Sequence, residues 1–448
     1  MRQAFREFLL LPTCIITGFL VLAALTYALD QSRAEWLEPV RGLLAAYAFS
    51  DPKATADVLS TVAGALATIV SITITLLLIA LQQSASSLTH QIYDQFLRRR
   101  YNQFYFGFFV GLSLYSLLAL ATVGPVNPVF GASLTVLLMI VALYLLIVMF
   151  YTTIDQMRPS AIIAAIHDHV LMARAHQQAL LQRTRRRSRL SAPVRYRARA
   201  AHPGFVTAID IANLAGALEH CESDIELELR VAIGGFVATG DELAVVRAYS
   251  ERDARAIGSM VEPAIERRRD RDLFSDPLNG IEEMETIAWT TISSAQSDPD
   301  PARTVICGLR DLLACWTAEE TAAGDEAARI VYPDNVMSRL MDGFESLAVS
   351  ASESMQHQTY AEILRALTRM FERLPQPLQR RAEDIVLSSL SGLGEHILTA
   401  DLRAALEDAA ETLRRNARSE SAQAVRTALA RLGRSVGRLG SRGSRASG

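Results

Sequence analysis

The sequence predicts an integral membrane protein: four transmembrane α-helices, followed by a cytoplasmic α+β region with a small β-module and a helical domain. Three observations support this fold class. The 448-residue chain is 50% hydrophobic and only 21% charged, which is too apolar for an ordinary soluble protein. The first third contains long stretches without charged side chains. Beyond it, residues 155–200 carry a net charge of +8 and residues 201–448 a net charge of −12.

Four uncharged stretches have the length of membrane-spanning helices, which need about 20 apolar residues. We expect spans at about 8–29, 58–81, 104–122 and 129–151 within a transmembrane domain of residues 1–154. The last two come from one uncharged run, 101–154, which Gly and Pro residues interrupt at Val123–Pro128. The alternative is a set of buried core helices, but those are usually shorter and amphipathic.

The distribution of arginine predicts the orientation of these spans. Arg2 and Arg6 precede the first span, and arginines 98–100 follow the second, whereas the hairpin between the third and fourth spans has none. Cytoplasmic loops are enriched in Lys and Arg. We therefore expect a multi-pass protein of the bacterial inner membrane with both termini in the cytoplasm. Four cysteines without a disulfide pattern fit a reducing compartment.

The second predicted span carries a stripe of small and polar side chains at alternating spacings of three and four. Its members are Thr61, Gly64, Thr68, Ser71, Thr75 and Gln82, and the apolar Leu78 occupies the remaining position of the repeat. Small residues let helices approach each other, and hydroxyls can bond between helices. Gly107 and Gly111 form a GxxxG pattern with the same meaning. We interpret both patterns as helix packing, with a polar path along the stripe as the alternative.

The end of the second span and the start of the third carry a recognisable pattern. It runs from Ser71 through Ala80–Ser87 (ALQQSASS) to Phe96–Phe104 (FLRRRYNQF), and continues with Gly107–Gly111 and Tyr115. This pattern resembles the bacterial predicted membrane proteins of the domain of unknown function 2254. The resemblance is strong over roughly 55–150 and continues in order to about 320. It implies four N-terminal helices and a cytoplasmic domain, and it supplies no activity, catalytic residue or cofactor.

Residues 155–194 are predicted to form a basic juxtamembrane helix and linker. Five arginines follow the helix closely: Arg183, Arg185, Arg186, Arg187 and Arg189. Near an anionic leaflet each could contribute about 1 kcal/mol of binding free energy. We expect these arginines to contact anionic lipid head groups. A solvated loop that only fixes topology is compatible with that expectation.

Residues 195–248 are predicted to form the small β-module. Arg195, Arg197 and Arg199 alternate with less polar residues, which is the period of a strand. Gly204–Asp210 and Gly235–Asp241 both read GFVxxxD. Such paired units resemble the two halves of a biotinyl/lipoyl-type domain, with the two glycines in equivalent turns. That fold carries its cofactor on a lysine, and the chain's one lysine lies elsewhere, so we expect a scaffold without a cofactor.

Residues 249–432 are acidic and read as a helical domain, and the basic tail 433–448 is predicted to be disordered. Helices are expected near 251–270, 281–294, 301–317, 334–350, 353–373, 377–392 and 396–432. No GxSxG, HExxH, P-loop or GxGxxG motif stands in its proper setting. We therefore predict no catalytic residues, no metal and no cofactor. The net charge of −3 argues against a nucleic-acid partner.

These observations favour a non-enzymatic, membrane-anchored scaffold or sensor that forms a homo-oligomer. The alternative is an oligomeric channel or transporter in which the stripe of the second span lines the path. A stripe buried within one subunit would favour the scaffold, and a stripe around the axis of an oligomer would favour the channel.

Overall fold

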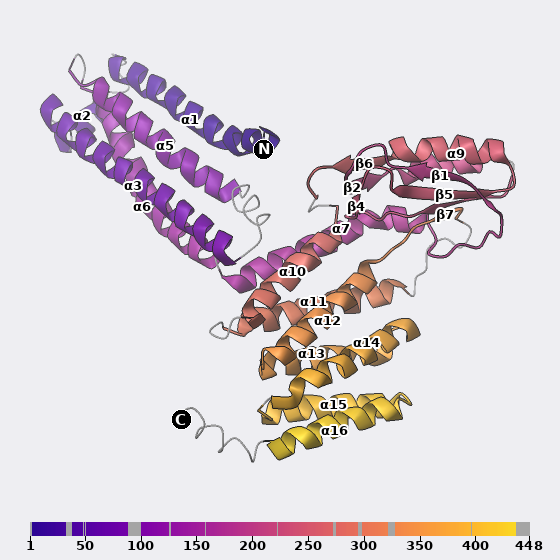
Figure 1. Cartoon of the computed structure of the whole chain (residues 1–448). Helices are drawn as coiled ribbons and strands as arrows, with labels where there is room; N and C mark the ends of the chain where they lie inside the picture. The colour runs from indigo at the N-terminus through magenta and orange to yellow at the C-terminus, as the bar shows by residue number, and fades with distance from the viewer. Residues whose placement is uncertain are drawn as a thin grey trace. The chain divides into compact units, whose positions relative to one another are not determined.

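The structure is a computed structural model of the chain (Figure 1). It describes residues 2–32, 38–47, 49, 51–87, 100–124, 127–156, 158–221, 223–271, 275–293, 298–320, 328–395 and 397–435. The chain divides into two compact units, Met1–Ala161 and Ile162–Gly448. Each unit has its own buried core.

The first unit is a bundle of helices. Its long members are α1 (Arg2–Gln31), α3 (Pro52–Ser87), α5 (Arg100–Ala121) and α6 (Val129–Gln156), and α2 (Glu38–Tyr47) is a short helix between α1 and α3. Four stretches are long and apolar enough to cross a membrane: Leu9–Gln31, Pro52–Leu76, Tyr101–Ala121 and Val129–Asp155. The predicted set of four membrane-capable helices is confirmed. The short helix α2 was not predicted.

Helix α5 is the most buried of the four membrane-capable helices, and it contacts α1, α3 and α6. Its aromatic side chains Phe108, Phe109 and Tyr115 are buried, and Phe19 of α1 packs edge-on against Phe108. The core of the unit is therefore built around aromatic residues of one helix.

Polar contacts fix the ends of α1 and α6. The Asp30 carboxylate accepts hydrogen bonds from the Phe130 and Gly131 amides, at 2.9 and 3.1 Å, in the first turn of α6. These amides have no partner within their own helix. The Arg41 guanidinium of α2 donates to carbonyls at the end of α1, including that of Ser32 at 2.7 Å. The two residues thereby join the end of α1 to α2 and to the start of α6.

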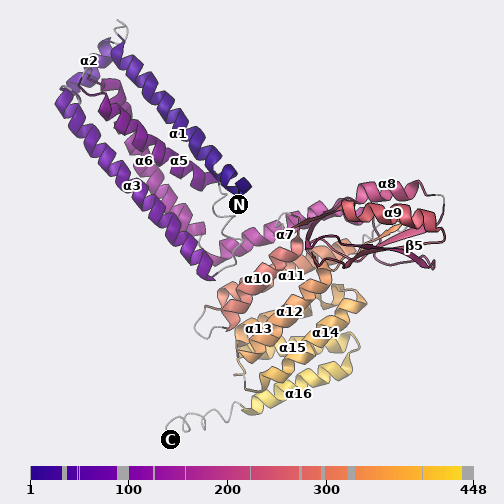
Figure 2. The same cartoon turned by 45° about the horizontal axis from the view of Figure 1, so that its top comes forward.

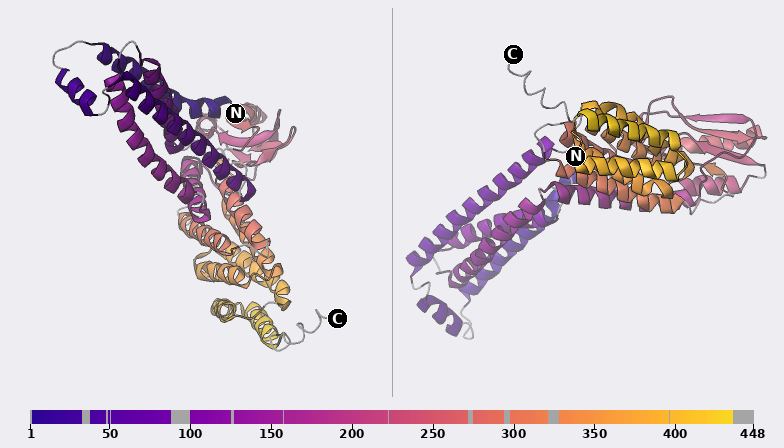
Figure 3. Two further views of the ribbon diagram at one scale, coloured as in Figure 1. Left: turned by 90° about the vertical axis from the view of Figure 1, so that its left-hand side faces the viewer. Right: turned by 90° about the horizontal axis from the view of Figure 1, so that it is seen from below.

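The second unit contains a stack of helices in two layers (Figures 1 and 2). One layer holds α10 (Pro277–Ser293), α12 (Val336–Glu353), α14 (Gln376–Ser389) and α16 (Ser419–Ser435), and the other holds α11 (Asp300–Glu320), α13 (His357–Met370) and α15 (Ala400–Arg415). Short 3₁₀ turns, η2 (Phe371–Arg373) and η3 (Leu390–Glu395), follow α13 and α14. Figure 3 shows the same stack from two further directions.

Helix α7 (Pro159–Gln182) lies in the second unit from Ile162 onwards, and this portion packs on the stack. Val170 of α7 lies so close to Gly280 of α10 that a Cβ at Gly280 would overlap it. His167 of α7 lies beside Gly308 of α11, with its Nε2 3.1 Å from the Asp311 carboxylate. Helix α7 thus contacts both α10 and α11 at the start of the stack, and residues 183–276 are inserted between α7 and α10.

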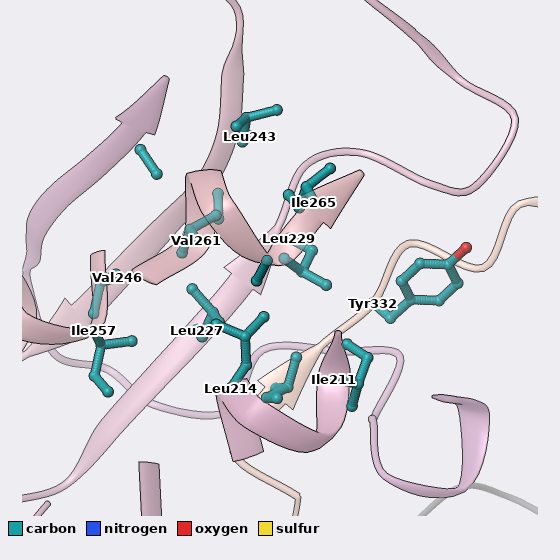
Figure 4. Close-up of a cluster of buried hydrophobic side chains, with 14 of the residues drawn as sticks. Ile211, Leu214, Leu227, Leu229, Leu243, Val246, Ile257, Val261, Ile265 and Tyr332 are labelled. Carbon is teal, nitrogen blue, oxygen red and sulfur yellow. The ribbon is translucent and has the colours of Figure 1, made fainter. Parts of the chain in front are cut away.

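The inserted residues, together with the short strand β7 from later in the chain, form two small sheets. The first has the order β1 (Val194–Arg199), β5 (Glu242–Ala248), β3 (Ile225–Leu229), β7 (Ile330–Val331), and the second has the order β4 (Phe236–Val237), β2 (Gly204–Ile209), β6 (Ile265–Arg268). Helices α8 (Ile211–Glu219) and α9 (Glu251–Ala264) complete this region. Its core contains Leu227 of β3, Val246 of β5 and Ile257 of α9 (Figure 4).

The biotinyl/lipoyl-like prediction is not confirmed. Helix α8 separates the two GFVxxxD copies, and both sheets use strands from beyond residue 248. The copies pair with each other in antiparallel fashion, with Phe205 opposite Phe236. Gly204 opens strand β2, whereas Gly235 lies in the turn before β4, so the two glycines are not in equivalent turns.

Two predicted helices differ in extent from the observed ones. The expected helix 251–270 ends at Ala264, because Ile265–Arg268 is extended and pairs with β2. The expected helix 396–432 is split into α15 and α16 at Ala417, which has a left-handed backbone (φ +60°). There the Arg418 amide donates to the Leu413 carbonyl at 2.9 Å, which is the closing bond of a Schellman cap.

Candidate functional site

The stripe of α3 faces away from the other described helices of its unit. Thr61, Gly64, Thr68, Ser71 and Thr75 are all exposed, and the side chain of Gln82 lies outside the described residues. A Cβ built at Gly64 would meet no described atom within 4 Å. The Thr68 hydroxyl bonds to the Gly64 carbonyl of its own helix. Helix α3 instead buries Leu59 and Leu66 on its opposite side.

The outward face of α6 provides a contrast within the same bundle. Its exposed side chains are large and apolar: Leu137, Ile140, Leu143, Tyr144 and Ile147. Large apolar side chains suit contact with lipid tails, whereas small and hydroxyl residues gather where helices approach each other. The two faces therefore differ in chemistry, and the α3 stripe is the one suited to another helix or to water.

The glycines of α5 lie against α1. A Cβ at Gly107 would lie 2.8 Å from the Cα of Pro12, and one at Gly111 would overlap the Phe19 ring. Both glycines therefore permit close approach of two helices within the subunit. A larger side chain at either glycine would have to displace the neighbouring residue of α1.

The basic segment after α7 is held against the first sheet. The Arg185 amide donates to the Ile330 carbonyl, and the Tyr332 amide donates to the Arg185 carbonyl, both at 2.9 Å. The Arg185 side chain pairs with Glu226 of β3. Arg186 lies 3.5 Å from Asp334, and the side chains of Arg183, Arg187 and Arg189 are exposed. Of the five arginines predicted to contact lipid, Arg185 is thus partly buried against Glu226, and the other four lie at the surface.

Glu226 is the anchor of that segment. Its side chain is 1% exposed and accepts from the Ser188 hydroxyl, from the Arg189 amide at 2.9 Å and from the Leu190 amide at 3.2 Å. Burial is the largest single effect on the Glu226 pKa and would raise it. The hydrogen bonds from Ser188, the two amides and Arg185 together outweigh burial and hold the pKa below its usual value.

A second buried pair joins α7 to the segment before α12. Arg174 donates to both Asp334 oxygens, at 3.0 and 2.8 Å, and the two side chains are 3% and 4% exposed. The Arg174 guanidinium also lies 5.7 Å from the centre of the Trp316 ring of α11. One turn further along α7, the Gln177 amide group donates to the Ser275 carbonyl at 3.0 Å. Helix α7 is therefore fixed to three later parts of the chain.

Asp276 starts a ladder of alternating charges. Its carboxylate caps α10 through the Leu278 amide and pairs with Arg271 at 2.7 Å, yet burial is the largest effect and raises its pKa. From Arg271 the ladder continues across α10, α12 and α14 through Glu282, Arg339, Asp342, Arg381 and Glu345. Neighbouring helices of one layer are thus linked by ion pairs.

This network was largely missed by sequence reasoning. Arg174 and Asp334 are 160 residues apart, and Glu226 reads simply as one polar position in an alternating strand. Asp276 before Pro277 did carry a local signal, because an Asp ahead of a helix is a common N-cap. Within the described residues, no group of three or more His, Cys, Asp and Glu is placed to hold a metal ion. The arrangement is suited to holding α7, the sheet and the stack together.

Breaking the buried pair should cost far more than breaking an exposed one. We expect Arg174→Met or Asp334→Leu alone to lower the free energy of unfolding by about 3–5 kcal/mol, because each leaves a buried charge without the partner that binds it through two hydrogen bonds. The double variant should lose much less than the sum. Thermal unfolding of the detergent-solubilised chain measures this. Arg303→Met, at the exposed Arg303–Asp300 pair, should change stability by less than about 1 kcal/mol. Additive single losses would contradict the assignment.

The lowered pKa of Glu226 predicts an acid-sensitive contribution to stability. A carboxyl with a depressed folded-state pKa stabilises fully above its unfolded pKa, about 4.3 for Glu, and loses this contribution as the pH falls through the folded value. Glu226→Gln should therefore lower the melting temperature at pH 7, and the difference from the unchanged chain should shrink below about pH 4. Glu251→Gln, at an exposed position, is the control. A pH-independent difference would contradict the role of the charge.

Comparison with known proteins places the chain in a family. Neither a curated protein nor a solved structure matches it. A family model described as "Predicted membrane protein (DUF2254)" matches residues 6–369. That range contains all four membrane-capable helices, the inserted sheets and the stack as far as α13. The chain therefore belongs to the DUF2254 family of predicted membrane proteins.

Proposed function

We propose that the protein is a non-enzymatic scaffold, anchored in the bacterial inner membrane with both termini in the cytoplasm. The observation that carries the proposal is the two-layer stack formed by α7 and α10–α16. Stacked helical pairs form extended surfaces, and such surfaces commonly bind other proteins. The distribution of arginine around the membrane-capable helices supports the orientation.

The position of α7 adds a sensor-like element to this proposal. The chain passes from α6 to α7 with one residue, Met157, between the described stretches. The same helix is fixed in the stack by Arg174 and by its contact with Gly280. A displacement of α7 would therefore be passed on to its neighbours α10 and α11. The side chains of Arg183, Arg187 and Arg189 lie at the surface, where anionic head groups could contact them.

Site-specific photo-crosslinking in the native membrane tests the scaffold. A photoreactive amino acid at Arg369 of α13 or Arg403 of α15, both exposed, should give a discrete adduct with another protein. The matched control is Arg255, which is 76% exposed on α9, outside the stack, and should give none. Equal labelling at all three positions, or no adduct at Arg369 and Arg403, would count against a binding surface on the stack.

A channel or transporter is the second candidate, and the outward position of the α3 stripe favours it. In a homo-oligomer that brings the stripes together, the hydroxyls of Thr61, Thr68 and Thr75 would surround a common axis. The same outward position suits a simple packing interface between copies. The two alternatives make different demands on Gly64, because a path needs open space and an interface needs close contact.

Gly64→Leu separates these alternatives. If the stripe packs against another copy, the added side chain should weaken self-association by about 1–3 kcal/mol, the usual cost of overpacking. If it lines a path, the oligomer should persist while ion or solute flux into liposomes falls. Light scattering in detergent measures the first effect. Gly18→Leu is the matched control, since Gly18 on α1 is also exposed with no described atom near its Cβ position. Unchanged association and flux would exclude both roles for the stripe.

A further inference from the structure

Helix α2 presents an apolar face that no described residue of its own unit covers. Val40 is 47% exposed and Leu43 is 61% exposed, and a spacing of three places them on one side of the helix. We propose that this face lies in the boundary between the head groups and the acyl chains of the bilayer, so that α2 is an interfacial anchor. The proposal stands independently of the scaffold or channel function.

An adjacent side of α2 is fixed to the bundle. Leu44 packs against a buried cluster that includes Leu59 of α3 and Val129 of α6. The Arg41 guanidinium donates to carbonyls at the end of α1 and lies 5.8 Å from the centre of the Phe130 ring. With these contacts in place, α2 cannot rotate to bury Val40 and Leu43, and their exposure follows from the packing of the helix.

The exposed apolar face of α2 contrasts with the exposed side of α9. Helix α9, in the second unit, also packs by one side, and its exposed side carries Glu251, Arg252 and Arg255. A helix that faces water on one side normally has polar residues there. The chemistry of α2 therefore indicates an apolar surrounding for Val40 and Leu43.

The position of α2 in the chain points to lipid as that surrounding. The candidate span of α1 ends at Gln31, seven residues before α2 begins, and the candidate span of α3 starts at Pro52, soon after α2 ends. Leu25 and Leu29 of α1 are exposed just before that point. With ten residues, α2 is only about 15 Å long and cannot cross the bilayer. An apolar face next to span ends is the pattern of a helix lying in the interface.

Spin-label accessibility of the full chain in lipid nanodiscs tests the proposal. In a background without the four native cysteines, Val40→Cys and Leu43→Cys carry a nitroxide, and oxygen is compared with a water-soluble nickel chelate as relaxing agent. Glu38→Cys, on the same helix with a 64% exposed side chain, is the aqueous control, and Leu143→Cys, exposed on α6, is the lipid control. Gel filtration shows that each labelled chain keeps its assembly.

We expect the ratio of oxygen to nickel accessibility at Val40 and Leu43 to be shifted from the Glu38 value towards the Leu143 value. Ratios equal to the Glu38 value would overturn the proposal, because the face would then lie in water. Low accessibility to both agents would also overturn it, since a protein surface and not lipid would then cover the face.

Discussion

A buried backbone amide needs a hydrogen-bond acceptor, and three buried carboxylates provide one at places where separate elements of the chain meet. Asp30 accepts from the amides of Phe130 and Gly131, Glu226 from those of Arg189 and Leu190, and Asp276 from those of Leu278 and Asn279. Asp30 and Glu226 each lie on a different part of the chain from the amides that they satisfy. Asp276 instead starts a helix, α10, on which later elements pack. The architecture of both units depends on these bonds, because an unsatisfied buried donor costs about 1–3 kcal/mol.

The surroundings of the two carboxylates in the second unit lead to opposite electrostatic outcomes. Glu226 receives bonds from Ser188, Arg185 and two amides, and these lower its pKa in spite of burial. Asp276 has a guanidinium and two amides, yet burial dominates and raises its pKa. Glu226 therefore favours the folded state as an anion, whereas ionised Asp276 is maintained at a cost.

The spans were predictable because the signal is local: a run without charge long enough to cross a bilayer identifies a helix without reference to the rest of the chain. The β-region was not predictable from the sequence, because its strands pair with strands far away in the chain. Strand β7, at Ile330–Val331, joins β3 about a hundred residues earlier, and β6 replaces the end of an expected helix. The break at Ala417 also lacks a Gly or Pro signal, so the sequence reads as one continuous helix. The role of α7 as the first helix of the stack depends on Arg174 meeting Asp334, which no spacing rule indicates.

The insertion between α7 and α10 has a mechanical consequence. Strand β7, between α11 and α12, completes the first sheet, and Arg185, just after α7, pairs with Glu226 in the same sheet. The inserted region is thus tied to the stack just after α7 and again between α11 and α12. The sheet cannot separate from the stack without breaking the Arg185–Glu226 pair and the bonds between Arg185 and the 330–332 segment. Because α7, the sheet and α12 share these contacts, a shift in any one of them must be accommodated by the other two. The contacts of Arg185 therefore couple α7, the first sheet and the segment before α12 at the start of the stack.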